Sequence, residues 1–339
     1  MSSSPAQQPS PQLFFQTINA YQRTEALKAA IELEVFTAIA EGNSTAGEIA
    51  KRCGASDRGT RILCDFLCII GFLTKDGSRY ALTLDSTVFL DKRSPAYIGG
   101  ITEFISTEKL TDNFRNFAAV VRNGGSLDTE GGTVAPENPI WVKFARAMVP
   151  MMAMPAQAMA KLVDPDANQK LKILDIAAGH GIFGITFAVN NQQAEVVALD
   201  WPKVLEVAKE NAEKAGVASR YSTIEGSAFD VDFGSGYDLI LLTNFLHHFD
   251  IPTCETLLRK VHAALADGGR AITLEFVPNE DRISPPDAAA FSMMMLGSTP
   301  SGDAYTFSQL EQMCANAGFS QSENHDLPPS IEQVVISRK

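Results

Sequence analysis

The feature that most constrains the fold of this chain is an alternation of strand-like and helix-like segments, which begins at Leu171 and runs almost to the C-terminus. The strand-like runs are KILDIA, EVVALD, YSTIEG, YDLILLT and RAITLEF, and helical periodicity lies between them, as in VLEVAKENAEKAG and residues 254–266. Repeated β-α units predict a parallel, doubly wound α/β sheet that binds ligands at the carboxyl ends of its strands. A last helix is expected after Thr306, followed by a closing antiparallel hairpin.

A glycine-rich turn, LDIAAGHGIFG, follows the first of these strands and opens a helix. Glycines at such a turn let the backbone bend sharply and approach a ligand closely. Gly179, Gly181 and Gly184 match the pattern G-x-G-x-x-G, and Asp200 lies near the offset of about 20 residues at which an acid holds a ribose. The pattern predicts a nucleotide site and leaves a nicotinamide-dependent oxidoreductase open. The histidine within the turn, His180, is expected to point to solvent.

Three features favour a single nucleotide that carries an amino acid over a dinucleotide. Asp175 ends the first strand just before the glycines, where a carboxylate can face an ammonium group but would repel a pyrophosphate. The glycine pattern begins in mid-chain, and no second mononucleotide-binding half follows it. His247 and His248, in TNFLHHFD, come at the carboxyl edge of the sheet, where a base would lie beside the ligand.

The chain before this sheet is expected to contain several distinct parts. Residues 1–12 are polar and Pro-rich, lack the basic and apolar regions of a signal peptide, and predict a disordered tail. Apolar residues recur at helical spacing from Leu13 to about Ala40, which predicts one long helix or two short ones. Residues 106–168 predict a helical connector with a Gly-rich interruption and a Met-rich final segment.

Between these parts lies a winged-helix pattern. Thr45 can cap a helix that Gly54 ends, Ser56 can cap a second helix, and two short strands flank the turn Asp76-Gly77. Residues 1–105 carry 10 Lys and Arg residues against 11 Asp and Glu residues, whereas phosphate contacts need a basic face. We therefore expect no nucleic-acid binding, and we expect the apolar helix faces to pack against a second subunit in a homodimer.

The overall composition limits the remaining partners and the compartment. The net charge of −12 disfavours attraction to nucleic acid and to anionic membranes, and no apolar stretch reaches the roughly 18 residues that a membrane span needs. The five cysteines are scattered and contain no C-x-x-C, so neither a disulfide framework nor a metal site is predicted. We expect a reducing, cytoplasmic location and a small neutral or apolar substrate.

The order of the motifs LDIAAGHGIFG, ALDWP, EGSAF, NFLHHFD, LADGGRAITLEFVP and YTFSQLEQMCANAGF resembles one known family over residues 13–339. It is similar to the S-adenosylmethionine-dependent small-molecule O-methyltransferases, which include plant phenolic and bacterial antibiotic-pathway enzymes. The resemblance implies a Rossmann-like class I methyltransferase sheet at 169–339 that ends in an antiparallel hairpin. It also implies a winged-helix-like dimerisation domain at 13–105 and an acceptor-pocket segment within 106–168.

The resemblance assigns site residues where the motifs match. His247 would be the general base, and Glu275 would be the acid that positions it. S-adenosylmethionine, without a metal, would be bound by Asp175, Ala177, Gly179, Gly181, Asp200, Trp201, Ser227, Ala228, Phe229 and Thr243. The acceptor pocket would be lined by Phe144, Met148, His248, Met295 and Thr299.

Four positions depart from the pattern of the family. Ala177 stands where many members carry the first glycine, and Ser227 replaces a common Asp beside the adenine. His248 replaces the Asp that often follows the base, and Ala304 stands where plant members tend to have a second glutamate. The last two changes give the acceptor site a different charge from the plant pattern, so no plant substrate is transferred to this chain.

The resemblance implies methyl transfer to a hydroxyl group, phenolic in character, of a small and largely apolar metabolite. Such a transfer needs the alignment of donor and acceptor and one base. A neutral histidine, with a reference pKa of about 6.5, can accept the proton of a phenol as the new bond forms. Two other classes stay open: an NAD(P)-dependent oxidoreductase that uses the glycine turn, and a non-enzymatic winged-helix regulator that senses a nucleotide.

Overall fold

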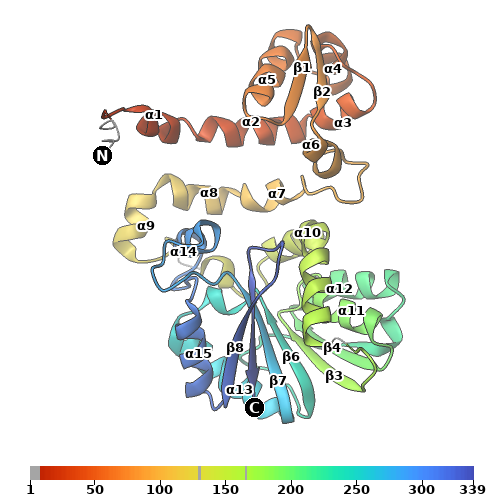
Figure 1. The fold of residues 1–339 in the computed structure, drawn as a ribbon, viewed down its shortest axis with the longest axis vertical. Coiled ribbons are helices and arrows are strands. Elements are labelled where there is room, and N and C mark those ends of the chain that lie inside the picture. The colour runs from red at the N-terminus through yellow and green to blue at the C-terminus, as the bar shows by residue number, and fades with distance from the viewer. Residues whose placement is uncertain (1–7, 129–130, 165) are drawn as a thin grey trace, which may run out of the picture. The chain divides into compact units, whose positions relative to one another are not determined.

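The computed structural model describes residues 8–128, 131–164 and 166–339 and divides into two compact units, one that ends at Thr102 and one that starts at Glu103 (Figure 1). The predicted tail covers residues 1–12, and residues 1–7 of it lie outside the described residues. The division falls close to the expected boundary after residue 105. The separation of 106–168 from the sheet domain stays a prediction.

The N-terminal unit contains a helix–helix–hairpin arrangement. Its elements are α1 (Gln12–Ile18), α2 (Tyr21–Glu32), α3 (Val35–Ala40), α4 (Ala46–Cys53), α5 (Asp57–Ile69), β1 (Leu73–Asp76), β2 (Arg79–Leu82) and α6 (Leu84–Phe89). The prediction of one or two helices before Ala40 is wrong, because the described chain forms three: α1 ends at the C-cap Asn19, and the left-handed Glu34, at φ 56°, separates α2 from α3. Thr45 caps α4, the left-handed Gly54 ends it, and Ser56 caps α5, as predicted.

Several helices precede the large sheet, and the first of them begins just before the division between the two units. They are α7 (Ile101–Ile105), α8 (Glu108–Arg115), α9 (Phe117–Asn123), the 3-10 turn η1 (Gly132–Val134) and α10 (Ile140–Val163). The Gly-rich interruption lies between α9 and α10, as predicted. Met148, Met152 and Met159 recur at helical spacing on the buried side of α10. Of the helices that the structure describes, none is both long and apolar enough to cross a membrane.

The large sheet has seven strands in the order β5-β4-β3-β6-β7-β9-β8. They are β3 (Leu171–Ile176), β4 (Ala194–Asp200), β5 (Tyr221–Glu225), β6 (Tyr237–Thr243), β7 (Leu265–Glu275), β8 (Gln321–Asp326) and β9 (Gln333–Arg338). The strands from β3 to β7 are parallel, and β8 and β9 form an antiparallel hairpin whose β9 pairs with β7. This confirms the predicted doubly wound sheet and its closing hairpin.

Helices cover both faces of this sheet, as Figure 1 shows. They are α11 (Ile182–Asn190), α12 (Pro202–Lys214), α13 (Ile251–Ala264) and α15 (Phe307–Asn316), whereas α14 (Pro286–Ser298) packs against α8 and α9. Helix α10 packs against α11 and α12 on one side, and α13 packs against α15 on the other. The main core lies between the sheet and α13 and α15 and includes the fully buried Leu174, Ile240 and Leu258. Helix α14 was not predicted.

Candidate active site

The site is built at the edge where the parallel strands end. Asp175, Asp200, Thr243 and Glu275 are the last or next-to-last residues of β3, β4, β6 and β7. From β3 the chain continues to β4 and β5 on one side, and it then returns to β6 on the other side of β3. A ligand crevice is expected at this switch point. The predicted residues from four strands are therefore brought to one edge.

The glycine turn between β3 and α11 keeps its backbone close to β4. Ala177, Gly179 and Gly181 all have left-handed φ angles, of 54°, 57° and 73°. The Ala178 N–H donates to the Leu199 carbonyl at 3.1 Å. The left-handed region favours glycine, so Ala177 holds a strained conformation. The glycine that many members of the resembled family carry at this position would adopt it freely.

Two glycines of the turn have no room for a side chain. A Cβ atom on Gly181 would lie 2.5 Å from the Tyr221 hydroxyl oxygen, and one on Gly184 would lie 2.9 Å from Asp175 Oδ2. The match to G-x-G-x-x-G thus has a steric cause at these two positions. The absence of side chains there lets α11 approach β3 and β4 closely.

Two carboxylates flank this turn. Asp175 is fully buried, its Oδ2 accepts a hydrogen bond from the Gly184 N–H at 3.0 Å, and its Oδ1 has no hydrogen-bond partner among the described residues. Burial, with a smaller contribution from Asp200, raises the pKa of Asp175 to about 7. Asp200 accepts from the N–H groups of Gly179 and Trp201, at 2.8 and 2.7 Å, and burial raises its pKa to about 6.

The loop after β5 carries the predicted Ser227, Ala228 and Phe229. Ser227 Oγ accepts from the Phe229 N–H at 3.2 Å, and the Phe229 ring packs edge-on against Phe249. Lys260 Nζ donates to the carbonyls of Ala228 and Phe229 at 3.0 and 3.2 Å. This lysine therefore fixes the loop from α13, which sequence reasoning did not foresee.

His247 lies in the 3-10 turn η3 (Leu246–His248) just after β6, and it is paired with Glu275. His247 Nδ1 and Glu275 Oε2 are 2.5 Å apart, and both side chains are buried. Glu275 Oε1 accepts from the N–H groups of Phe245, Leu246 and His247, at 3.1, 2.9 and 3.4 Å. One carboxylate thus holds both the imidazole and the backbone turn that carries it. A proton on Nδ1 leaves Nε2 as the acceptor of the neutral ring.

His248 is the second histidine of the turn. Its ring centroid lies 4.4 Å from that of His247, and the Trp141 ring packs edge-on against it at 5.3 Å. Its Nδ1 is buried without a hydrogen-bond partner among the described residues. Burial and the neighbouring His247 lower the pKa of His248, which keeps its ring neutral.

The predicted acceptor residues come from α10 and α14. Phe144 on α10 stacks against His180 with ring centroids 6.5 Å apart, and Met148 is buried one turn further along α10. Met295 and Thr299 are buried at the end of α14, where Thr299 Oγ1 accepts from the Gly302 N–H at 2.8 Å. A Cβ atom on Gly302 would collide with the His247 carbonyl, so this end of α14 lies close to the η3 turn.

Sequence reasoning missed or misplaced three aromatic side chains. His180 does not point to solvent: it is buried between Phe144 and Phe183, its Nδ1 accepts from the Ile182 N–H at 3.2 Å, and burial lowers its pKa to about 4. Trp141 contacts both Phe144 and His248, and its place one helical turn before Phe144 was the available signal. Phe291 packs edge-on against His247 at 4.9 Å, but it lies in the unpredicted α14.

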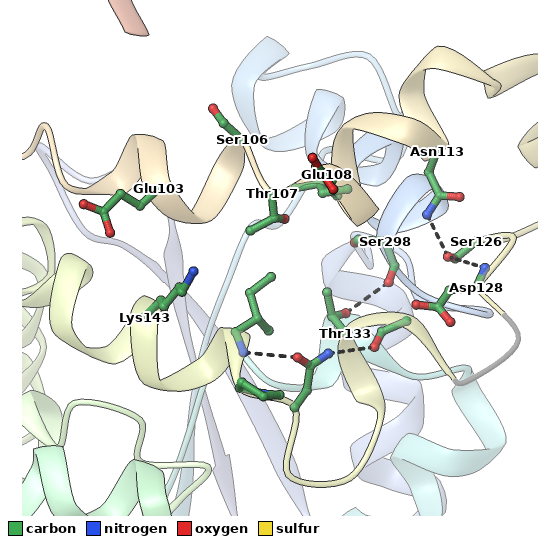
Figure 2. A pocket seen from close by; sticks show the side chains of 15 residues that line it. Glu103, Ser106, Thr107, Glu108, Asn113, Ser126, Asp128, Thr133, Lys143 and Ser298 are labelled. Atoms are coloured by element: carbon green, nitrogen blue, oxygen red, sulfur yellow. Dashed lines mark hydrogen bonds between the residues drawn. The ribbon is translucent and has the colours of Figure 1, made fainter. Parts of the chain in front are cut away.

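A cavity of about 680 Å³ borders the acceptor segments (Figure 2). Lys143 and Ser298, which line it, are the sequence neighbours of Phe144 and Thr299. In Figure 2, Glu103 and Lys143 lie at one end of the cavity, and Asn113 and Ser126, joined by a hydrogen bond of 2.9 Å, lie at the other. The described residues that line it are mostly polar and do not include His247.

Comparison with known families agrees with this geometry. Residues 132–320 match the O-methyltransferase domain, and residues 15–92 match the O-methyltransferase dimerisation domain. The chain belongs to the O-methyltransferase family. Together with the relatives below, these matches make it an S-adenosylmethionine-dependent enzyme, and they do not support the oxidoreductase or the regulator.

Individual relatives align with this methyltransferase over nearly their whole length. The 3-hydroxy-5-methyl-1-naphthoate 3-O-methyltransferase of Streptomyces sahachiroi is 27% identical over 88% of this chain and 86% of its own. A solved structure of a candidate O-methyltransferase from Nostoc punctiforme is 55% identical, covers 98% of this chain and 100% of its own, and has a TM-score of 0.95. Human N-acetylserotonin methyltransferase, solved with S-adenosylmethionine, shares the fold at 21% identity, with a TM-score of 0.86 and 99% of each chain covered.

Within the residues that the structure describes, no group of three or more His, Cys, Asp or Glu side chains could hold a metal ion. The five cysteines are free.

Proposed function

We propose that this methyltransferase transfers a methyl group from S-adenosylmethionine to a phenolic hydroxyl of a small, largely apolar aromatic metabolite, with His247 as the general base. The observation that carries the proposal is the set of hydrogen bonds that Glu275 makes with His247 Nδ1 and with three successive backbone N–H groups. A carboxylate with these four contacts fixes both the tautomer and the direction of the imidazole, as the orienting acid does in a hydrolase triad. The cytoplasmic location stays a prediction.

The residues around the glycine turn fit the cofactor. Asp175 Oδ1, a buried acceptor without a donor among the described residues, suits an ammonium group, whereas a pyrophosphate would meet two carboxylates. Asp200 would accept from the ribose hydroxyls, and Trp201 and the loop of Ser227, Ala228 and Phe229 would hold the adenine. Ala177, Gly179, Gly181 and Thr243 would supply close backbone and shape contacts. When bound, the cofactor would supply a methyl group on a sulfonium, from which a neutral thioether leaves readily.

The acceptor side supports an aromatic substrate. Trp141 and Phe291 place their rings beside His248 and His247, and Phe144 packs against Trp141. Met148 and Met295 add adaptable apolar surface. His248 and Thr299 are the polar groups that would orient a second substituent. The naphthoate enzyme of Streptomyces sahachiroi and the acetylserotonin enzyme of Gallus gallus, 26% identical over 92% of each chain, both carry aromatic compounds in their names.

The chemistry that this chain must perform is alignment and removal of one proton. The aromatic walls on α10 and α14 would hold the acceptor ring and exclude water. His247 Nε2 would accept the hydroxyl proton as the new oxygen–carbon bond forms, and Glu275 would stabilise the resulting imidazolium from the Nδ1 side. His248, with its lowered pKa, stays neutral and does not compete for the positive charge.

The dimerisation-domain match supports a homodimer through the N-terminal unit. Helix α1 and the start of α2 expose large apolar side chains, among them Leu13, Phe14, Phe15, Ile18 and Tyr21, each more than half exposed. An apolar surface of this size favours burial against a second copy. Light scattering at micromolar concentration should give the mass of a dimer, and a monomer would contradict this part of the proposal.

The proposed base is tested by His247→Ala. We expect turnover to fall by about 10²- to 10⁴-fold, the usual contribution of a general base, because the alanine side chain cannot accept the hydroxyl proton. The affinity for S-adenosylhomocysteine, measured by calorimetry, should stay nearly unchanged. His325→Ala, on the C-terminal hairpin, is the matched control. A hydroxylated naphthoate and hydroxyindole panel would serve as acceptors, and wild-type turnover by His247→Ala would refute the base.

A further inference from the structure

The loop that follows β5 begins as one helix-like turn at the edge where the parallel strands end. The Gly226 N–H donates to the Asp200 carbonyl at 3.0 Å, so the loop starts beside the residue whose carboxylate would hold the ribose. The Ser227 carbonyl then accepts from the N–H groups of Asp230 and Val231, each at 3.0 Å. These two bonds close the turn within the loop itself.

The carbonyl groups at the far end of this turn are satisfied by one side chain. A helix that continued would pair the carbonyls of Ala228, Phe229 and Val231 with its next N–H groups, but this turn ends there. All three carbonyl oxygens instead accept from Lys260 Nζ, at 3.0, 3.2 and 2.5 Å. An ammonium group has three hydrogens, so its donors match these acceptors in number. Lys260 thus caps the end of the turn, where a cation is also favoured.

The surroundings of the Lys260 ammonium group favour a charge only while these contacts are made. Its Nζ lies 4.3 Å from the centroid of the Phe233 ring, a side chain that is itself buried. Burial lowers the pKa of Lys260, and the charges of Asp230 and Asp232 oppose this shift. A charge that is partly removed from water needs hydrogen-bond partners, and the three carbonyls provide them. The contacts of Nζ are therefore specific and not those of a lysine that extends into solvent.

Lys260 also joins two parts of the fold that the sheet keeps apart. In the strand order, β4 and β3 lie between β5 and β6. The loop follows β5, whereas Lys260 lies on α13, which follows β6 and the histidine turn. The loop is therefore fixed at its start by the end of β4 and at its far end by a helix from the other half of the sheet. The motif resemblance assigned no role to this lysine.

We propose that Lys260 is a positioning residue for the cofactor, whose ammonium group fixes the turn of residues 227–231 in the conformation that binds the adenine. The contact between this loop and the adenine rests on the proposed function, but the contacts of Lys260 with the loop do not. A loop that holds its binding conformation only about a tenth of the time weakens the apparent affinity about tenfold. Lys260 accordingly acts on cofactor binding and not on the chemical step.

The test replaces Lys260 with methionine, which keeps an apolar stem and removes all three donors. We expect the affinity for S-adenosylhomocysteine, measured by calorimetry, to fall about tenfold, and KM for S-adenosylmethionine to rise by a similar factor. Turnover at saturating cofactor should stay within about twofold of wild type, because only cofactor binding is weakened. Arg259→Met is the matched control, since Arg259 is the neighbouring cation on α13 but is exposed and pairs with Glu255.

Hydrogen exchange of the peptide that covers residues 226–233 reports on the loop itself in the cofactor-free protein. Lys260→Met should exchange faster than wild type in this peptide, and unchanged exchange in β3 and β6 would show that the sheet is folded. Lys260→Arg keeps the charge and the donors, so it should lose less protection and less affinity than Lys260→Met.

Three outcomes would overturn the proposal. Unchanged exchange of the loop in Lys260→Met would show that the lysine does not fix it. Equal losses in Lys260→Met and Lys260→Arg would show that the shape of the stem matters and the donors do not. Faster exchange with unchanged affinity would remove the effect on the cofactor and, with it, the assignment of the loop to the adenine. Failure of His247 as the base is seen in turnover and would leave exchange and affinity unchanged.

Discussion

Around the glycine turn, the groups at the catalytic edge are backbone N–H groups and two carboxylates, whereas around His247 they are side chains from several separate elements. Gly179 and Trp201 present their N–H groups to Asp200, and Gly181 and Gly184 have no room for a side chain. The rings beside the two histidines come instead from α10 and α14. We call the groups around the glycine turn the cofactor half of the site and those around His247 the acceptor half. Because its contacts are largely backbone, the cofactor half can keep one cofactor through large sequence change, whereas the side chains of the acceptor half can change to suit another acceptor.

The Glu275 contacts allow the acceptor half to be broken without disturbing the cofactor half. In Glu275→Gln the carbonyl oxygen of the amide can still accept from the backbone of residues 245–247, but its NH₂ group faces His247 Nδ1. That contact forces the proton to Nε2, so the ring can no longer act as a base. By analogy with the same change in a hydrolase triad, we expect turnover to fall by about 10⁴-fold.

The measurements for Glu275→Gln are steady-state turnover and calorimetric affinity for S-adenosylhomocysteine. An unchanged affinity with lost turnover would support the separation of the two halves. A parallel loss of affinity would show that Glu275 also supports the glycine turn, and turnover near wild type would exclude tautomer control.

The cofactor half should instead respond to pH. Burial raises the pKa of Asp175 to about 7, so the folded protein keeps a proton that the unfolded chain releases near pH 4. The stability of the cofactor-free protein therefore falls as pH rises from about 4 to about 7. In Asp175→Asn this loss should shrink by roughly 3 kcal/mol, as shown by urea unfolding at pH 5 and pH 8. The exposed Asp267→Asn is the control, and an equal pH dependence in Asp175→Asn and wild type would contradict the prediction.

The same contrast explains what could be predicted from the sequence. The cofactor half follows patterns with fixed spacing, such as the glycine turn and the acid that ends β4, because local backbone geometry requires them. The pairing of His247 with Glu275 came from motif resemblance alone, since β6 and β7 must first be aligned. Phe291, Trp141 and the buried His180 escaped prediction because their neighbours come from distant segments.

The smallest expected effect is the difference between alanine substitutions at two glycines. It tests whether the lack of room for a side chain, and not backbone conformation alone, explains the glycines of the cofactor half. Gly181 and Gly216 both have φ angles of 73°, but a Cβ atom on Gly181 would meet the Tyr221 hydroxyl and Ala208, whereas one on Gly216 meets nothing within 4 Å. Both alanine variants carry the strain of the left-handed region, of about 1 kcal/mol. Gly181→Ala alone must also displace α12 or β5, which adds about 1–3 kcal/mol.

Urea unfolding of the two alanine variants measures this difference directly, because the strain common to both cancels. We expect the free energy of unfolding to fall further in Gly181→Ala, with weaker binding of S-adenosylhomocysteine in that variant only. Equal losses in the two variants would mean that the turn yields easily and that its glycines serve backbone conformation alone. The cofactor half would then be as adaptable as the acceptor half, and the contrast between them would have to rest on the carboxylates Asp175 and Asp200.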